Sequence, residues 1–310
     1  RTSFVTPQSS RRRAIFSGRR TKRGTIVGFQ SPRSNNIVSI LGCIVVDKKM
    51  LSFLPGMKKI TELACTRSSI VKIHVSISEN GLDVSVNNGK ILDKELRISL
   101  AIIANEYKLA RLSWAGELLV SLELPIQKLG DIKIIPPEEF FMQATKEAEV
   151  AMVDDVYETL KNETSVMDLF SGFGTFALPL SKTKRVFAYE QSQKMIEALD
   201  LASRQVVKSA PIKAITRNLY KHPILAKDFY GIEGVVVNPP RAGAAAQCKE
   251  LSRSGVKTIV LVSCNPKTFA RDAEILVKGL YNLEWVKVID QFRWSHHIEI
   301  IAKFSIGFKL

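Results

Sequence analysis

The sequence predicts an α/β protein whose carboxyl-terminal half forms a mostly parallel sheet, preceded by a smaller α+β domain. From residue 146 onward, short apolar segments alternate with segments of helical periodicity, which is typical of βαβ units with helices on both faces of a sheet. Residues 1–140 instead mix short strands with helices, and Pro136-Pro137 marks the end of that region. We therefore expect two domains, 1–140 and 141–310, in a chain of 310 residues that is long enough to bury a core in each.

Local patterns predict the elements of the smaller domain. Residues 70–77 alternate between apolar and polar, and Glu79-Asn80-Gly81 then forms the turn of a hairpin. Asp93 to Tyr107 carries apolar residues at helical spacing, with Asp93 as the amino-terminal cap. The strands expected here are 14–16, 25–29, 37–40, 70–77 and 82–86, with a turn at 21–24.

The positive charge of the chain is concentrated at its start. The net charge is +15, yet the first acidic residue is Asp47, and the basic residues before it include Arg11, Arg12 and Arg13. An acid-free, Arg- and Ser-rich start is compatible with an organelle transit peptide. The strand patterns in the same segment favour a folded basic arm that faces RNA or DNA, because arginine–phosphate contacts dominate such binding.

Composition narrows the class of protein. No apolar run is long enough to span a bilayer, so we expect no membrane association. The four cysteines are widely scattered and form neither a disulfide framework nor a Cys-x-x-Cys pair. A reducing, cytoplasmic setting is the simplest interpretation.

The larger domain is expected to continue the strand–helix alternation to its end. Its expected helices lie at 146–161, 192–207, 244–254 and 267–279, and residues 175–181 follow a glycine turn. Its expected strands are 166–170, 185–189, 234–237, 258–263 and 300–304.

A glycine-containing loop follows the first of these strands, in the segment Asp168-Leu169-Phe170-Ser171-Gly172-Phe173-Gly174-Thr175. Alone, Gly-x-Gly is often a plain tight turn. Glu190, however, ends the next strand, where a carboxylate can accept hydrogen bonds from both ribose hydroxyls of a nucleoside. The dinucleotide pattern Gly-x-Gly-x-x-Gly is not met, and the acidic Asp168 favours S-adenosylmethionine.

Three further motifs close later strands. Asn238-Pro239-Pro240-Arg241-Ala242-Gly243 is a rigid loop or merely a connector. Cys264 is either a small buried side chain or a nucleophile whose thiolate the following helix stabilises with its amino end. His296-His297-Ile298-Glu299 precedes the last strand, and we expect no metal there because no third ligand stands at workable spacing.

In combination and order, these motifs resemble the RNA (uracil-5-)methyltransferases, and the resemblance covers nearly the whole chain. It implies a Rossmann-like class I methyltransferase domain that uses S-adenosylmethionine and releases S-adenosylhomocysteine. It also implies that Cys264 is the nucleophile and Glu299 the base of a reaction through a covalent Cys–C6 uracil adduct. The cofactor contacts that it implies are Gln143, Phe170, Thr175, Glu190, Asn218 and Asn238.

The chain departs from the family pattern in several places. Thr175 stands where the family often has Asn, and Asn238 stands where it usually has Asp, which removes a carboxylate from the reaction centre. Many relatives carry an amino-terminal β-barrel and four cysteines for an iron–sulfur cluster. Only Cys43 falls where the last of those ligands would lie, so we expect no cluster in the chain as written.

The leading hypothesis is a monomeric enzyme that methylates uridine in RNA, with 23S ribosomal RNA favoured by Cys43 and the Arg-rich start. A transfer RNA m5U methyltransferase and a non-catalytic RNA-binding remnant stay open as alternatives. Cytosine-5 chemistry is disfavoured because Ser263, not Pro, precedes Cys264. Amino-group methylation is disfavoured because Arg241 replaces the aromatic residue expected after Asn-Pro-Pro.

Overall fold

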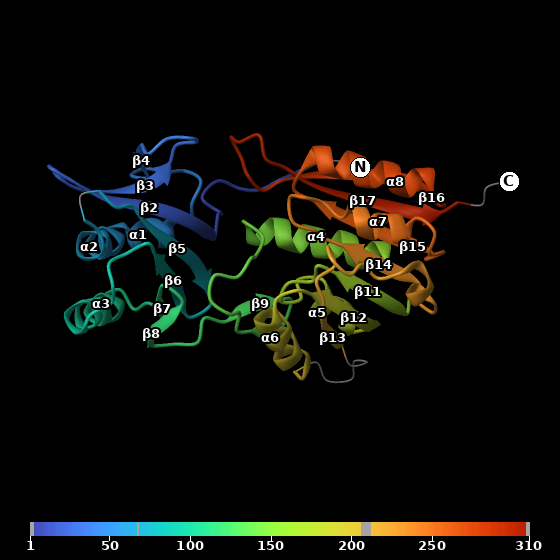
Figure 1. The fold of residues 1–310 in the computed structure, drawn as a ribbon, viewed down its shortest axis with the longest axis horizontal. Coiled ribbons are helices and arrows are strands. Elements are labelled where there is room, and N and C mark those ends of the chain that lie inside the picture. The colour runs from blue at the N-terminus through green and yellow to red at the C-terminus, as the bar shows by residue number, and fades with distance from the viewer. Residues whose placement is uncertain (1–2, 67, 206–211, 308–310) are drawn as a thin grey trace. The chain divides into compact units, whose positions relative to one another are not determined.

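A computed structural model describes residues 3–66, 68–205 and 212–307 of the chain. The chain divides into two compact units, each with its own sheet (Figure 1). We call Pro7–Gln127 with Ile135–Lys146 the amino-terminal unit. We call Arg1–Thr6 with Lys128–Ile134 and Glu147–Leu310 the carboxyl-terminal unit.

The amino-terminal unit is a seven-stranded sheet with helices packed on one face. The strand order is β4-β3-β2-β5-β6-β7-β8, and all neighbours are antiparallel except β6 and β7. The bounds are β2 Arg13–Thr21, β3 Gly24–Gln30, β4 Ile37–Ser39, α1 Lys48–Ser52, α2 Leu54–Ala64, β5 Val71–Ser78, β6 Gly81–Asn87, α3 Lys94–Glu106, β7 Arg111–Trp114 and β8 Glu117–Ser121.

Alternation along the strands builds the core of this unit. In β2, Ala14 and Phe16 are buried with residues of α2 and α3, while Ile15 between them is exposed on the other face. The predicted helix is confirmed as α3, and the Asp93 carboxylate accepts a hydrogen bond from the Leu96 amide at 2.8 Å. The predicted strands and the turn at 21–24 are also confirmed. The helices α1 and α2 were not predicted.

The basic start of the chain forms β2 and β3, which confirms the folded arm, but its arginines do not all face solvent. Arg12 is buried, and its Nε donates to the main-chain oxygen of Gln143 at 3.3 Å. Burial and the neighbouring arginines lower the pKa of Arg13 to about 10, and its guanidinium lies 4.6 Å from the Phe141 ring centre. Arg12 is therefore not exposed in this structure, and RNA binding by the basic start of the chain stays a prediction.

The carboxyl-terminal unit confirms the predicted α/β fold. Its eight-stranded sheet has the order β1-β16-β17-β15-β14-β11-β12-β13, in which only β17 runs antiparallel to its neighbours. The bounds are β1 Phe4–Val5, β11 Ser165–Leu169, β12 Arg185–Glu190, β13 Lys213–Thr216, β14 Gly234–Val237, β15 Thr258–Ser263, β16 Tyr281–Asp290 and β17 Glu299–Ile306. A separate two-stranded sheet pairs β9 (Gln127–Leu129) with β10 (Ile132–Ile134).

Helices connect the parallel strands and cover the sheet. On one face, Val235 and Val237 share a core with residues of α7 and α8. The helix expected to end at 207 is α6, and positions 206 and 207 lie outside the described residues. The helical bounds are α4 Lys146–Thr159, α5 Ala177–Ser181, α6 Gln193–Ser203, α7 Ala245–Leu251 and α8 Pro266–Lys278, with a 3₁₀ turn at Ala226–Phe229.

The strands β13 and β16 were not predicted from the sequence. Among the described residues, no helix combines the length and apolar character that crossing a membrane requires.

Candidate active site at the carboxyl edge of the sheet

Most of the predicted site residues lie along one edge of the carboxyl-terminal sheet. Because β11 to β15 are parallel, their carboxyl ends meet at this edge. The antiparallel β17 begins there. The residues so collected are Phe170 after β11, Glu190 at the end of β12, Asn218 after β13, Asn238 after β14, Cys264 after β15 and Glu299 at the start of β17.

The glycine loop and Glu190 hold each other in place. The Gly172 amide donates to Glu190 Oε2 at 3.2 Å, and the Ser192 amide donates to Oε1 at 3.0 Å. Gly172 has φ +56°, and a Cβ at this position would meet no atom within 4 Å. The loop therefore leaves space beside a fixed carboxylate, an arrangement that suits the ribose of a nucleoside.

Aromatic and amide side chains border the same loop. Phe170 has φ +62°, a conformation that costs a non-glycine residue energy and that clusters at functional sites. Its ring lies 5.3 Å from the Tyr220 ring. The Asn218 side-chain oxygen Oδ1 accepts from the main-chain amide of Tyr220 at 3.0 Å, and the main-chain amide of Asn238 donates to the main-chain oxygen of Leu169 at 3.1 Å.

Two buried polar atoms under the loop have no partner in the described part of the chain, Asp168 Oδ1 and Ser171 Oγ. Asp168 Oδ2 accepts from the Ala177 amide at 2.9 Å. The pKa of Asp168 is raised to about 8, chiefly by burial and in smaller part by the Glu190 charge, against the Ala177 hydrogen bond, which lowers it. Buried polar groups are normally satisfied, so these atoms fit a ligand that brings its own polar groups. The predicted contact Thr175 is also buried in this loop.

Cys264 and Glu299 are brought together by strand register. Ser263, the last residue of β15, pairs with Ile300, so Cys264, which follows it, comes opposite Glu299, the first residue of β17. Burial raises the pKa of Glu299 to about 7, against a hydrogen bond from Gln291 and the positive charge of Arg241. Burial and the Glu299 charge raise the pKa of the Cys264 thiol, while Arg241 lowers it. The net effect is opposite to the thiolate stabilisation expected from the following helix.

Arg241 and Gln291 are site residues that the sequence analysis did not assign. Arg241 stood in the Pro-Pro-Arg motif but received no role there. The structure places its guanidinium near enough to Cys264 to lower the pKa of the thiol, and its Nη2 lies 2.8 Å from His297 Nδ1. Gln291 follows β16 directly and is buried, and nothing in its local sequence marks it.

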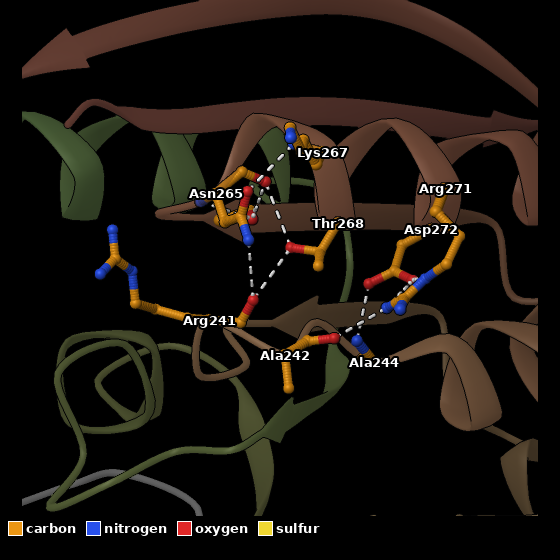
Figure 2. Close-up of polar contacts among 9 residues, drawn as sticks. Arg241, Ala242, Ala244, Asn265, Lys267, Thr268, Arg271 and Asp272 are labelled. Atoms are coloured by element: carbon orange, nitrogen blue, oxygen red, sulfur yellow. Dashed lines mark hydrogen bonds and ion pairs between the residues drawn. The ribbon is translucent and has the colours of Figure 1, made fainter. Parts of the chain in front are cut away.

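The first turns of α8 hold the loop that carries Arg241 (Figure 2). Asn265 caps the helix, with Oδ1 accepting from the Lys267 amide at 3.1 Å, and its Nδ2 donates to the Arg241 oxygen at 3.1 Å. The buried Asp272 accepts from the Ala244 amide at 2.6 Å. A Cβ at Gly243, φ +74°, would come within 2.5 Å of Asp272 Oδ2. The loop backbone is thus fixed while the Arg241 guanidinium extends away from the helix.

Gln143 belongs to the amino-terminal unit, whereas the other predicted site residues belong to the carboxyl-terminal unit. Its role as a cofactor contact stays a prediction. Within the described residues, no three His, Cys, Asp or Glu side chains gather closely enough to hold a metal ion.

Comparison with known proteins places this site in context. The profile of the family described as tRNA (Uracil-5-)-methyltransferase matches residues 94–303. An uncharacterized RNA methyltransferase of Agrobacterium fabrum is 39% identical over 293 residues, which cover 94% of this chain and 70% of the relative. The 23S rRNA (uracil(1939)-C(5))-methyltransferase RlmD of Shewanella woodyi is 32% identical over 308 residues, covering 96% and 68%.

A solved structure shows the same fold. The Pyrococcus abyssi tRNA (uracil-54, C5)-methyltransferase, in complex with S-adenosyl-L-homocysteine, superposes with a TM-score of 0.76 at 23% identity. The match covers 97% of this chain and 77% of that one.

Proposed function

The chain belongs to the tRNA (uracil-5-)-methyltransferase family, and from that premise we propose that it methylates C5 of a uridine in 23S ribosomal RNA through a covalent adduct between Cys264 and uracil C6. Family membership makes the chain an S-adenosylmethionine-dependent RNA methyltransferase. The register that sets Cys264 opposite Glu299, with the positive charge of Arg241 acting on both, carries the proposal for the adduct. The ribosomal target rests on the Shewanella relative alone.

The residues of the glycine loop fit S-adenosylmethionine. We assign the ribose hydroxyls to Glu190 and the neighbouring ring contacts to Phe170. The unpartnered Asp168 Oδ1 and Ser171 Oγ would form hydrogen bonds with the polar groups of the amino-acid part of S-adenosylmethionine. When bound, the cofactor supplies an electrophilic methyl carbon attached to a sulfonium.

Cys264 and Glu299 supply the two steps that uracil cannot perform alone. The Cys264 thiolate adds to C6, which turns C5 into an enolate-like carbon that is nucleophilic enough to accept a methyl group. Glu299 then accepts the C5 proton, and the electron pair of that bond restores the C5–C6 double bond as the C6–S bond breaks. Arg241 offers positive charge to the thiolate before addition.

Covalent trapping on fluorinated RNA tests the proposal. RNA from cells lacking 5-methyluridine, with 5-fluorouridine incorporated, should form a stable protein–RNA adduct because fluorine cannot leave as a proton does. Cys264→Ser should abolish the adduct, whereas the matched variant Cys43→Ser should keep it. Sequencing the trapped RNA distinguishes ribosomal from transfer RNA. Absence of any adduct with the wild type, or an adduct that survives Cys264→Ser, would contradict the proposed mechanism.

A variant at Asn238 provides a second test of the proposal. An amide at this position can hydrogen-bond but carries no negative charge. We expect Asn238→Asp to raise turnover, measured as tritium transferred from labelled S-adenosylmethionine to the same RNA prepared without 5-fluorouridine. A fall in turnover would show that the amide is the form suited to this site.

A further inference from the structure

We infer that Trp294 is a stacking platform for an unpaired RNA base next to the target uridine. The residue lies on the loop 291–298, which joins β16 to β17 and delivers Glu299 to the site. The inference rests on the proposed function in one respect, that the substrate is a uridine in RNA. Its test is a binding measurement that needs no turnover.

The exposure of Trp294 is the first observation. Its side chain is 58% exposed, whereas Trp114 is 3% exposed and Trp285 is half-buried. An indole left in water forgoes the stabilisation that its large apolar surface would gain on burial. The residue also has φ +62°, an unfavourable conformation for a bulky side chain. Such an outlier points to a function that the fold maintains against its cost.

The loop is nevertheless firmly held. The Phe292 amide donates to Asp290 Oδ1 at 3.0 Å, and the Ser295 amide donates to the Phe292 oxygen at 3.0 Å. On the other side of Trp294, the His297 amide donates to Ser295 Oγ at 3.1 Å. Trp294 is therefore presented by a fixed turn, as a preorganised contact requires.

A cation accompanies the indole ring. The Arg293 guanidinium carbon lies 4.8 Å from the Trp294 ring centre, and Arg293 Nη1 donates to the Thr6 oxygen at 3.3 Å. The pair offers an aromatic face for a base and a positive charge for its phosphate. Aromatic faces combined with basic side chains are how proteins bind single-stranded nucleic acid.

The position of Arg293 and Trp294 explains why an RNA base would stack there. Glu299 is 3% exposed, so a uridine must leave its stack to bring C5 to that carboxylate. The neighbouring base then loses a stacking partner. Trp294 stands on this loop five residues before Glu299, the first residue of β17, and the side chain of His297 in between contacts Arg241. A neighbouring base stacked on Trp294 would regain an aromatic partner.

Binding of a fluorescein-labelled single-stranded oligouridylate, followed by anisotropy without cofactor, tests the inference. Trp294→Ala should weaken binding by about 5- to 150-fold, the loss typical of one base–aromatic stack. Trp294→Phe should retain most of the affinity because a ring remains. Tyr230→Ala is the matched control, because Tyr230 is 97% exposed in the same unit but precedes β14 and so lies away from the carboxyl end of that strand. The affinity of this variant for the oligouridylate should not change.

The other outcomes are equally decisive. Unchanged affinity of Trp294→Ala, or an equal loss for a fully paired RNA hairpin, would overturn the stacking role. So would a loss of kcat at saturating RNA with unchanged KM, which would mean that Trp294 only positions Glu299. If Trp294→Ala does not fold, quenching of wild-type indole fluorescence by the oligouridylate, absent in Trp294→Phe, decides the question. Failure of methyl transfer with quenching intact would refute the proposed function and leave the platform standing.

Discussion

The carboxyl edge of the carboxyl-terminal sheet and the Arg-rich strands of the amino-terminal sheet differ in how position in the sequence relates to position in the fold. At the catalytic edge, Phe170 and Glu299 are far apart in the chain but reach one edge because strand ends converge there. Arg12, just before β2, and Ala14 within it are buried, while Ile15 is exposed. At the carboxyl edge, the parallel strand order brings residues that are distant in the sequence together. Along β2, the alternation of side chains places adjacent residues on opposite faces of the sheet.

The two regions also differ in what happens to charge. Burial at the carboxyl edge raises the pKa of Glu299 to about 7, so the carboxyl titrates near neutral pH. Burial in the amino-terminal unit lowers the pKa of Arg13 only to about 10, which leaves that guanidinium charged at neutral pH. Burial therefore leaves a carboxyl that titrates near neutral pH in one region and a guanidinium that stays charged in the other.

The largest expected effect comes from neutralising the catalytic edge. Glu299→Gln cannot accept the C5 proton, so turnover should fall by about 10²–10⁴-fold and the Cys264 adduct should accumulate on ordinary uridine. Denaturing gel electrophoresis of protein with labelled RNA measures both adduct and product. The matched variant Glu274→Gln, on the exposed side of α8, should leave both unchanged.

The pH profile sharpens this prediction. Below pH 7 the Glu299 carboxyl is mostly protonated and cannot act as a base, so the wild-type rate should rise as the pH increases through about 7. Glu299→Gln should lack this rise in its residual rate. A variant that retains full turnover, or the same rise, would remove Glu299 from the role of base.

A smaller effect is expected at the cofactor end of the same edge. Glu190→Ala removes a charge-assisted acceptor of the ribose hydroxyls, so affinity for S-adenosylmethionine should fall by about 1.5–3 kcal/mol, tenfold or more. Calorimetric titration measures it. Glu197→Ala, an exposed carboxylate on the neighbouring α6, is the control. Undiminished affinity of Glu190→Ala would show that the ribose binds elsewhere.

The carboxyl-terminal unit was largely predictable from the sequence because its signals are local and its topology is constrained. Apolar strands such as 234–237 are recognisable alone, and parallel connections place each following loop at the same edge. This is why Glu190, Asn238 and Cys264 could be assigned to one site. By contrast, β16 includes charged residues such as Glu284 and Lys287, and its half-buried pattern gives a weak strand signal.

The electrostatics of the site could not be predicted in the same way. The pKa of the Cys264 thiol depends on whether burial or the helix end has the larger effect, and on how near the charges of Glu299 and Arg241 lie. Only the packed structure supplies this information. The role of Gln291 depends likewise on β16 lying beside β17. The run of arginines before Asp47 shows the same limit, since its sequence reveals the charge but not which side chains are free.

The smallest expected effects distinguish a buried basic residue, Arg12, from exposed basic residues, Lys22 and Arg23. Arg12→Ala removes a buried hydrogen bond to the Gln143 oxygen, so the unit should lose about 1–3 kcal/mol of unfolding free energy, measured by urea denaturation. Its RNA-binding salt slope should not change. Lys22 and Arg23 are exposed in the turn after β2, so replacing them with alanine should flatten the slope of log affinity against log salt by about 0.7 to 0.9 for each phosphate that the side chains neutralise, at unchanged stability. The reverse pattern, a flatter slope for Arg12→Ala and an unchanged slope for the turn variant, would mean that the buried Arg12 becomes available when RNA binds, and that the contrast between the two regions holds only for the free protein.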